Sequence, residues 1–234
     1  MYFFKDNFVL LYKKQKNYAR TGFLQFLKGM FSVTEIVYTL GNQVYLNLTN
    51  AYPCRCAFCI RQNGDGVGTA ENLWFSSHAP SFEEVKAAVD AWDFSGYDKE
   101  VVFCGYGEPT CAYDTLLRTA EYLKKKGLRL RLNTNGLSDL INGKPTAEAI
   151  CKNIDTISVS LNAPTAEKYE KLCHPAFGEK AFDAMLAFAR QCKELGANVK
   201  FTVVDVIPPE DIEACKALAK SMDIPLRVRA YIAE

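Results

Sequence analysis

The stretch Arg129-Leu130-Arg131-Leu132-Asn133 decides the fold, because polar and apolar side chains alternate along it. Successive residues of a β-strand point to opposite faces, so one face of this strand is polar and the other is apolar. The same alternation occurs in residues 158–162 (SVSLN), 200–203 (KFTV) and 227–229 (RVR). Parallel strands that are covered by helices on both faces would instead be apolar throughout. The alternation therefore favours a sheet that packs on helices with one face and lines a cavity with the other.

Helical patterns separate the strands on either side of this stretch. Ser81 and Glu84 have the spacing of a capping box, which predicts that a helix begins there. Further helices are predicted around residues 113–126, 146–151, 182–195 and 209–222, and strands at 44–49, 101–104, 128–133, 156–161, 199–206 and 226–231. Residues 36–39 and 44–49 flank Gly41-Asn42 and predict a hairpin. This βα repeat predicts an α/β fold, a partial (β/α)6 TIM-like barrel of parallel strands preceded by a short β-hairpin.

Length and composition are those of a globular chain. The 234 residues are 49% apolar and 24% charged, which is ordinary for a single folded domain. A transmembrane helix needs about 20 consecutive apolar residues, and no such run is present, so no membrane span is predicted. The nine cysteines are an odd number and no secretory leader precedes them, which favours a reducing, cytoplasmic location over a disulfide framework.

Charge divides the chain into two parts. The net charge is +1, but residues 1–29 carry six basic and one acidic side chain, a net of +5, which leaves −4 for the rest. We therefore expect a basic, aromatic N-terminal extension over residues 1–34 and a single domain over residues 35–234. The extension is either a helix for a membrane surface or an anionic partner, or a poorly ordered segment, or a sequence upstream of a natural start at Met30.

Three cysteines lie close together just after the first strand of the repeat. Cys54, Cys56 and Cys59 fall within six residues, and clustered thiolates are ligands for zinc or for an iron–sulfur cluster. A structural zinc site needs a fourth ligand, and neither a second CxxC nor a nearby histidine supplies one. Three protein ligands would leave one iron of a 4Fe-4S cluster open to an exogenous molecule.

Several motifs follow the cysteines in a fixed order. Gly105-Tyr106-Gly107-Glu108-Pro109, Thr134-Asn135-Gly136 and residues 158–162 each stand at the end of a predicted strand. Together with the cysteines they resemble the radical S-adenosylmethionine (radical SAM) superfamily. Residues 58–61 (FCIR) and 64–68 (GDGVG) are most similar to its TatD-nuclease-associated members. The resemblance covers roughly residues 35–234.

The resemblance implies a cofactor set and a reaction. It implies a 4Fe-4S cluster on Cys54, Cys56 and Cys59 that cleaves SAM reductively to methionine and a 5'-deoxyadenosyl radical. The residues that it implies for binding SAM are Gly105, Tyr106, Gly107, Glu108, Asn133, Asn135, Ser158, Ser160 and Asn162. It further implies a reducing partner such as flavodoxin or ferredoxin, and a functional link to a TatD-type nuclease.

One spacing departs from the family pattern. The usual arrangement is Cx3Cx2C, whereas this chain has CxCx2C, so that alignment of Cys56 and Cys59 leaves Tyr52 in the first cysteine position. We expect Cys54 to reach a third iron through a changed loop path around Pro53. Otherwise only two local ligands remain, with Cys104 as the nearest reserve.

The polar strand faces indicate the substrate. Arg129, Arg131, Lys200, Arg227 and Arg229 predict a basic lumen and hence an anionic substrate that bears a carboxylate or a phosphate. Residues 64–68 lack the ending of a P-loop, and we expect them to form a mobile cover over the cluster. The alternative is a non-catalytic barrel that binds zinc or an Fe-S cluster and serves as a partner-binding module.

Overall fold

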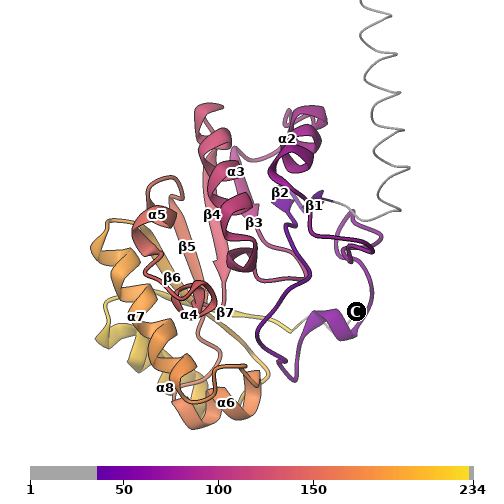
Figure 1. Ribbon diagram of the computed structural model, residues 1–234. Helices are drawn as coiled ribbons and strands as arrows, with labels where there is room; N and C mark the ends of the chain where they lie inside the picture. Colours follow the sequence, from indigo (N-terminus) through magenta and orange to yellow (C-terminus); the bar gives the residue numbers. More distant parts are fainter. Residues whose placement is uncertain (1–35, 232–234) are drawn as a thin grey trace, which may run out of the picture.

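One seven-stranded sheet forms the centre of the molecule (Figure 1). The computed structural model describes residues 36–231, and the predicted extension over residues 1–34 lies outside them. The strands are β1 (Val37–Leu40), β2 (Gln43–Leu46), β3 (Glu100–Phe103), β4 (Arg129–Thr134), β5 (Thr156–Ser160), β6 (Asn198–Val204) and β7 (Leu226–Arg229). They lie in chain order, with β1 antiparallel to β2 and all later neighbours parallel. A hairpin followed by a partial barrel of six parallel strands is confirmed.

The hairpin and the first helix form where their local signals predict. Leu40 pairs with Gln43, so Gly41-Asn42 is the two-residue turn, and Gly41 has a φ of +59°. Such a turn needs positive φ values, which glycine adopts without a steric cost. Ser81 caps α2 (Phe82–Ala91) in a complete capping box with Glu84.

Six further helices follow the strands. They are α3 (Tyr113–Lys125), α4 (Ser138–Asn142), α5 (Ala147–Cys151), α6 (Ala166–Cys173), α7 (Lys180–Glu194) and α8 (Pro209–Ser221), with 3-10 turns η1 (Ile60–Gln62) and η2 (Pro109–Ala112). The sequence predicted neither α4 nor α6, because each is too short to show a repeated apolar spacing. The omission of α6 matters, since the cysteine loop packs against its C-terminal end.

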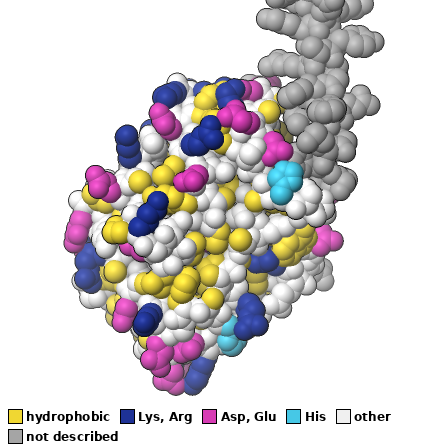
Figure 2. Space-filling view, viewed as in Figure 1, with side chains coloured by type: hydrophobic (Ala, Val, Ile, Leu, Met, Phe, Trp, Pro, Cys, Tyr) yellow, Lys and Arg dark blue, Asp and Glu magenta, His cyan; other side chains and the backbone are white. Residues whose placement is uncertain are grey.

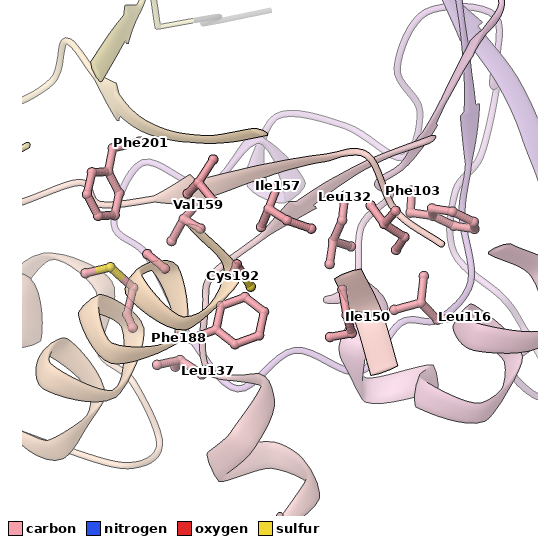
Figure 3. Close-up of a cluster of buried hydrophobic side chains, with 14 of the residues drawn as sticks. Phe103, Leu116, Leu132, Leu137, Ile150, Ile157, Val159, Phe188, Cys192 and Phe201 are labelled. Atoms are coloured by element: carbon pink, nitrogen blue, oxygen red, sulfur yellow. The ribbon is translucent and has the colours of Figure 1, made fainter. Parts of the chain in front are cut away.

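The apolar face of the sheet packs on the helices (Figure 3). Phe103, Leu132 and Ile157 from the strands meet Ile150 of α5 and Phe188 of α7, and all five are 0% exposed. Burial of each such side chain contributes roughly 1.5–3 kcal/mol. The alternate residues of the same strands face the opposite side, so the predicted polar face is present.

The outer surface is mixed in charge. Lysine and arginine side chains are interspersed with aspartate and glutamate on the face in Figure 2, without a patch of one sign. Among the helices in residues 36–231, none is long and apolar enough to cross a membrane.

Candidate functional site

A cavity of about 230 Å³ opens at the carboxyl ends of the parallel strands. This is the end at which βα barrels build their sites, because each strand is followed there by a loop. All nine residues that the resemblance implies for SAM line this one cavity: Gly105, Tyr106, Gly107, Glu108, Asn133, Asn135, Ser158, Ser160 and Asn162. The structure thus brings together residues from the ends of three strands, and their binding roles stay predictions.

The two glycines after β3 are required by close packing against the segment after β2. A Cβ atom on Gly105 would lie 2.0 Å from Oδ1 of Asn47, and one on Gly107 would lie 2.0 Å from the carbonyl oxygen of Thr49. Real Cβ atoms do not approach oxygen so closely, so any larger residue would push the two segments apart. The glycines therefore allow the close packing that fixes the backbone at the rim of the cavity.

Glu108 is buried, and both of its carboxylate oxygens are already hydrogen-bonded. Its Oε1 accepts hydrogen bonds from the backbone N of Thr110 at 3.1 Å and from the hydroxyls of Thr110 and Thr134 at 2.9 and 2.8 Å. Its Oε2 accepts from the backbone N of Asn135 at 2.8 Å. Burial raises the pKa of Glu108, and these hydrogen bonds counteract the rise. The carboxylate thus fastens the end of β4 to the turn after β3.

Asn162 carries an unused acceptor at the cavity. It lies just after β5 with a φ of +59°, and its Nδ2 donates to Sγ of Cys173 at 3.8 Å. Its Oδ1 is buried and has no hydrogen-bond partner among the described residues. A buried polar atom without a partner is costly, and one at the wall of a cavity is a candidate for contact with a ligand.

The basic residues of the strands are less exposed to the cavity than the sequence predicts. Of the five basic residues proposed for the lumen, only Arg229 lines the cavity. Arg131 instead forms an ion pair with Glu100 at 3.4 Å. Arg61, which the sequence did not single out, also lines the cavity, with its guanidinium carbon 4.5 Å from the centroid of the Trp74 ring. Among the described residues, two arginines therefore line the cavity: Arg229 at the end of β7 and Arg61 just after the cysteines of the loop.

Two of the three loop cysteines that the sequence predicts as ligands line the cavity. Cys56 and Cys59 line it, and so does Tyr52. Cys54 does not line it: its side chain belongs to the hydrophobic core, is 3% exposed, and accepts a hydrogen bond on Sγ from Nδ2 of Asn135 at 3.9 Å. Cys56 belongs to the same core and is 6% exposed, so Cys54 differs from it in not lining the cavity and in its contact with Asn135, and not in its burial.

Backbone hydrogen bonds hold this loop against the end of α6. The carbonyl of Pro53 accepts from the backbone N of Ala176 at 2.7 Å, and the N atoms of Arg55 and Ala57 donate to the carbonyls of residues 173 and 172 at 2.9 and 3.0 Å. The thiol of Cys56 is hydrogen-bonded to that of Cys173, which lowers the pKa of Cys56. These contacts fix the direction in which each side chain of the loop points.

The cavity fits SAM better than the thiols fit a cluster with three protein ligands. Aromatic and aliphatic side chains line the cavity together with polar groups such as Asn133, Ser158 and Ser160, and an amino acid joined to a nucleoside needs both kinds. By contrast, no three His, Cys, Asp or Glu side chains within residues 36–231 are grouped so as to hold a metal ion. Cys104, the reserve ligand, lines the cavity, but its thiol hydrogen-bonds to Asn133 on β4. The thiol set therefore does not fit the cluster that the resemblance implies.

The sequence missed several residues that line the cavity. They are Phe58, Arg61, Thr202, Val204 and Tyr231, and Tyr52 was noted only for its place in the spacing. Thr202 was within reach of sequence reasoning, because it stands beside Ser160 in the parallel register.

The glycine-rich loop of residues 64–68 is hydrogen-bonded to the body of the protein. The hydroxyl of Tyr106 donates to the carbonyl of Gly64 at 2.6 Å and lies 3.3 Å from that of Gly66. The backbone N of Leu73 donates to the carbonyl of Asp65 at 2.7 Å. These contacts do not suit the mobile cover that the sequence led us to expect.

Comparisons with known proteins agree with this geometry. The family model of the radical SAM superfamily matches residues 47–222. A radical SAM methyltransferase from Sphaerobacter thermophilus is 16% identical, with a TM-score of 0.57 over 83% of this chain and 68% of its own. SuiB from Streptococcus suis, bound to S-adenosylmethionine, is 19% identical, with a TM-score of 0.56 over 79% of this chain and 39% of its own. TYW1 with a lysine-pyruvate adduct is 16% identical, with a TM-score of 0.56 over 88% of this chain and 69% of its own.

These similarities have limits. At 16–19% identity the solved structures share the fold with this chain, which spans from 39% to 69% of their lengths. A search of the curated proteins finds no match.

Proposed function

Because the chain belongs to the radical SAM superfamily, we propose that the cavity at the carboxyl ends of its strands binds S-adenosylmethionine. The observation that carries the proposal is that nine residues from the ends of β3, β4 and β5 line one cavity. A site assembled from several strand ends is typical of the functional end of a βα barrel. The buried hydrogen bonds of Glu108 keep these strand ends in a fixed relation before any ligand arrives.

Two parts of SAM have a matching part of the cavity. The resemblance assigns the methionyl ammonium to the backbone around Gly105 and Gly107, which lines the cavity. The hydroxyls of Ser158 and Ser160 and the free Oδ1 of Asn162 are suited to the hydroxyls of the ribose. This division of roles is the one that the resemblance to the superfamily implies, and the donors and acceptors of these residues are compatible with it.

We further propose that the protein is an enzyme whose substrate is an anionic small molecule. Arg229 and Arg61 are the basic side chains that line the cavity, and a guanidinium group pairs with a carboxylate or a phosphate through two parallel hydrogen bonds. A reducing partner such as flavodoxin or ferredoxin, a link to a TatD-type nuclease and a cytoplasmic location stay predictions.

Reductive cleavage of SAM requires the 4Fe-4S cluster. The ligand roles of Cys54, Cys56 and Cys59 stay predictions, and only the last two of these residues line the cavity. We therefore derive no radical step for the chain as it stands. The position of only Cys56 and Cys59 at the cavity also favours a second candidate function. This is a non-catalytic barrel that binds a metal through these two cysteines and acts by binding a partner.

Binding of radiolabelled SAM at equilibrium tests the first proposal. Ser158→Ala removes one hydroxyl from the cavity wall and should weaken binding about tenfold, as expected for one lost hydrogen bond. Ser221→Ala, on α8 and outside the cavity, is the matched control and should bind as the wild type does. Absence of saturable binding, or equal losses in both variants, would contradict the proposal.

Metal analysis separates the two candidates. Zinc without iron or sulfide in protein that is purified without oxygen would favour the metal-binding module. Formation of 5'-deoxyadenosine after addition of dithionite and SAM would favour the enzyme.

A further inference from the structure

We propose that Tyr52, and not Cys54, occupies the first ligand position of the cysteine loop, so that this chain offers only Cys56 and Cys59 where a 4Fe-4S cluster would need three thiols. The proposal rests on the family membership of the chain and on the geometry of the loop. It does not depend on the proposal that the cavity binds SAM, because a separate binding measurement tests that proposal. Either proposal can therefore be wrong while the other holds.

Tyr52 shares the cavity with the two cysteines that follow it in the Cx3Cx2C register. Its side chain lines the cavity with Cys56 and Cys59, and Arg61 lies over its ring, 5.6 Å from the centroid. The backbone just before it is also held, because the carbonyl of Ala51 accepts from the backbone N of Glu108 at 2.9 Å. A side chain at position 52 is thus anchored beside the rim at which the other two thiols stand.

Cys54 is held in the core from three directions. The carbonyl before it and the N–H after it are bonded to the segment at the end of α6, at 2.7 and 2.9 Å. Its thiol accepts from Asn135, whose own Oδ1 accepts from the backbone N of Leu137 at 2.9 Å. Rotation of Cys54 toward the cavity would break the contact with Asn135, whereas Cys56, which is 6% exposed, lines the cavity as it stands.

Neither Cys173 nor Cys104 supplies the third thiol that a 4Fe-4S cluster would need. Cys173 is hydrogen-bonded to Cys56 and accepts from Nδ2 of Asn162 at 3.8 Å, and it does not line the cavity. Cys104 does line the cavity, but it hydrogen-bonds to Asn133, and no group of three ligands includes it within the described part of the chain.

Iron and sulfide analysis after anaerobic reconstitution tests the proposal in the full-length protein. The wild type should retain fewer than about two iron atoms per chain, and Tyr52→Cys should retain about four iron and four sulfide, since a 4Fe-4S cluster is held by cysteine thiolates. Tyr52→Ser is the matched control, because it removes the same ring without adding a thiol, and it should stay at the wild-type level. Circular dichroism establishes that each variant is folded.

Two cysteine variants identify the third ligand. Cys54→Ser should leave the iron content of the wild type unchanged, and Tyr52→Cys combined with Cys54→Ser should keep about four iron. The electron paramagnetic resonance signal of a reduced 4Fe-4S cluster should appear in both variants that carry Tyr52→Cys and be absent from the wild type.

The opposite pattern would overturn the proposal. About four iron in the wild type, lost in Cys54→Ser, would show that Cys54 is the third ligand. A folded Tyr52→Cys that gains no iron would show that position 52 does not reach the cluster.

Discussion

The substitution Glu108→Gln removes the charge of this side chain and should destabilise the protein strongly, although it only replaces one carboxylate oxygen by an NH₂ group. Glu108→Gln keeps one carbonyl oxygen for Thr110 and Thr134 but turns an NH₂ group toward the backbone N of Asn135, which now donates to Oε2 at 2.8 Å. One buried donor loses its partner, which costs about 1–3 kcal/mol. The remaining hydrogen bonds lose their charged acceptor, at about 1 kcal/mol each.

The desolvation of the carboxylate offsets part of this loss, because burial disfavours the charged form of Glu108. We therefore expect the free energy of unfolding to fall by about 2–4 kcal/mol, a large part of the 5–15 kcal/mol that is typical of a domain. Urea denaturation followed by circular dichroism measures it, and the midpoint should fall by roughly 1 M.

Glu121→Gln is the matched control for this measurement. Glu121 forms an exposed i,i+4 ion pair with Lys125 at 2.7 Å, and because solvent screens such a pair, its loss should leave the free energy of unfolding almost unchanged. If Glu108→Gln were as stable as this control, the carboxylate would not be what fastens β4 to the turn after β3.

Two further predictions concern a glycine and an aspartate. Gly107→Ala places a methyl group where the carbonyl of Thr49 lies 2.0 Å away and should lower the free energy of unfolding by about 1–3 kcal/mol in urea denaturation, whereas Gly64→Ala, with no atom within 4 Å, should not. Burial alone would raise the pKa of Asp90, but hydrogen bonds led by that from Lys126 hold it below its ordinary value. Asp90 therefore stabilises the fold above about pH 4, and this contribution is lost as the pH falls. Between pH 7 and pH 3 the wild type should lose about 1 kcal/mol more stability than Asp90→Asn in urea denaturation, and equal losses would contradict the assignment.

The sequence was sufficient for most of the fold. Alternation in residues 129–133 separated a one-sided parallel sheet from a doubly covered one, and the capping box at Ser81 marked a helix start. Both signals depend on residues that are close together in the chain, so they can be recognised in a single sequence. The short helix α6 was missed, because eight residues, four of them lysine or glutamate, are too few to show a repeated apolar spacing.

The sequence was less sufficient for the site. Strand register brought the nine predicted residues to one cavity, since parallel strands align their carboxyl ends. The direction of each thiol in the cysteine loop depends instead on backbone contacts with α6, far along the chain. The ion pair of Arg131 with Glu100 on a neighbouring strand is also a contact between residues far apart in the chain. Composition and spacing do not contain such information.

A crystal structure of the reconstituted protein with SAM, grown without oxygen, would test the cavity and the cysteine loop together. We expect SAM in the cavity against Gly105 and Asn162, with the ring of Tyr52 beside Cys56 and Cys59 and with Sγ of Cys54 still on Asn135. SAM at another place, or a cluster iron bound to Cys54, would contradict this expectation.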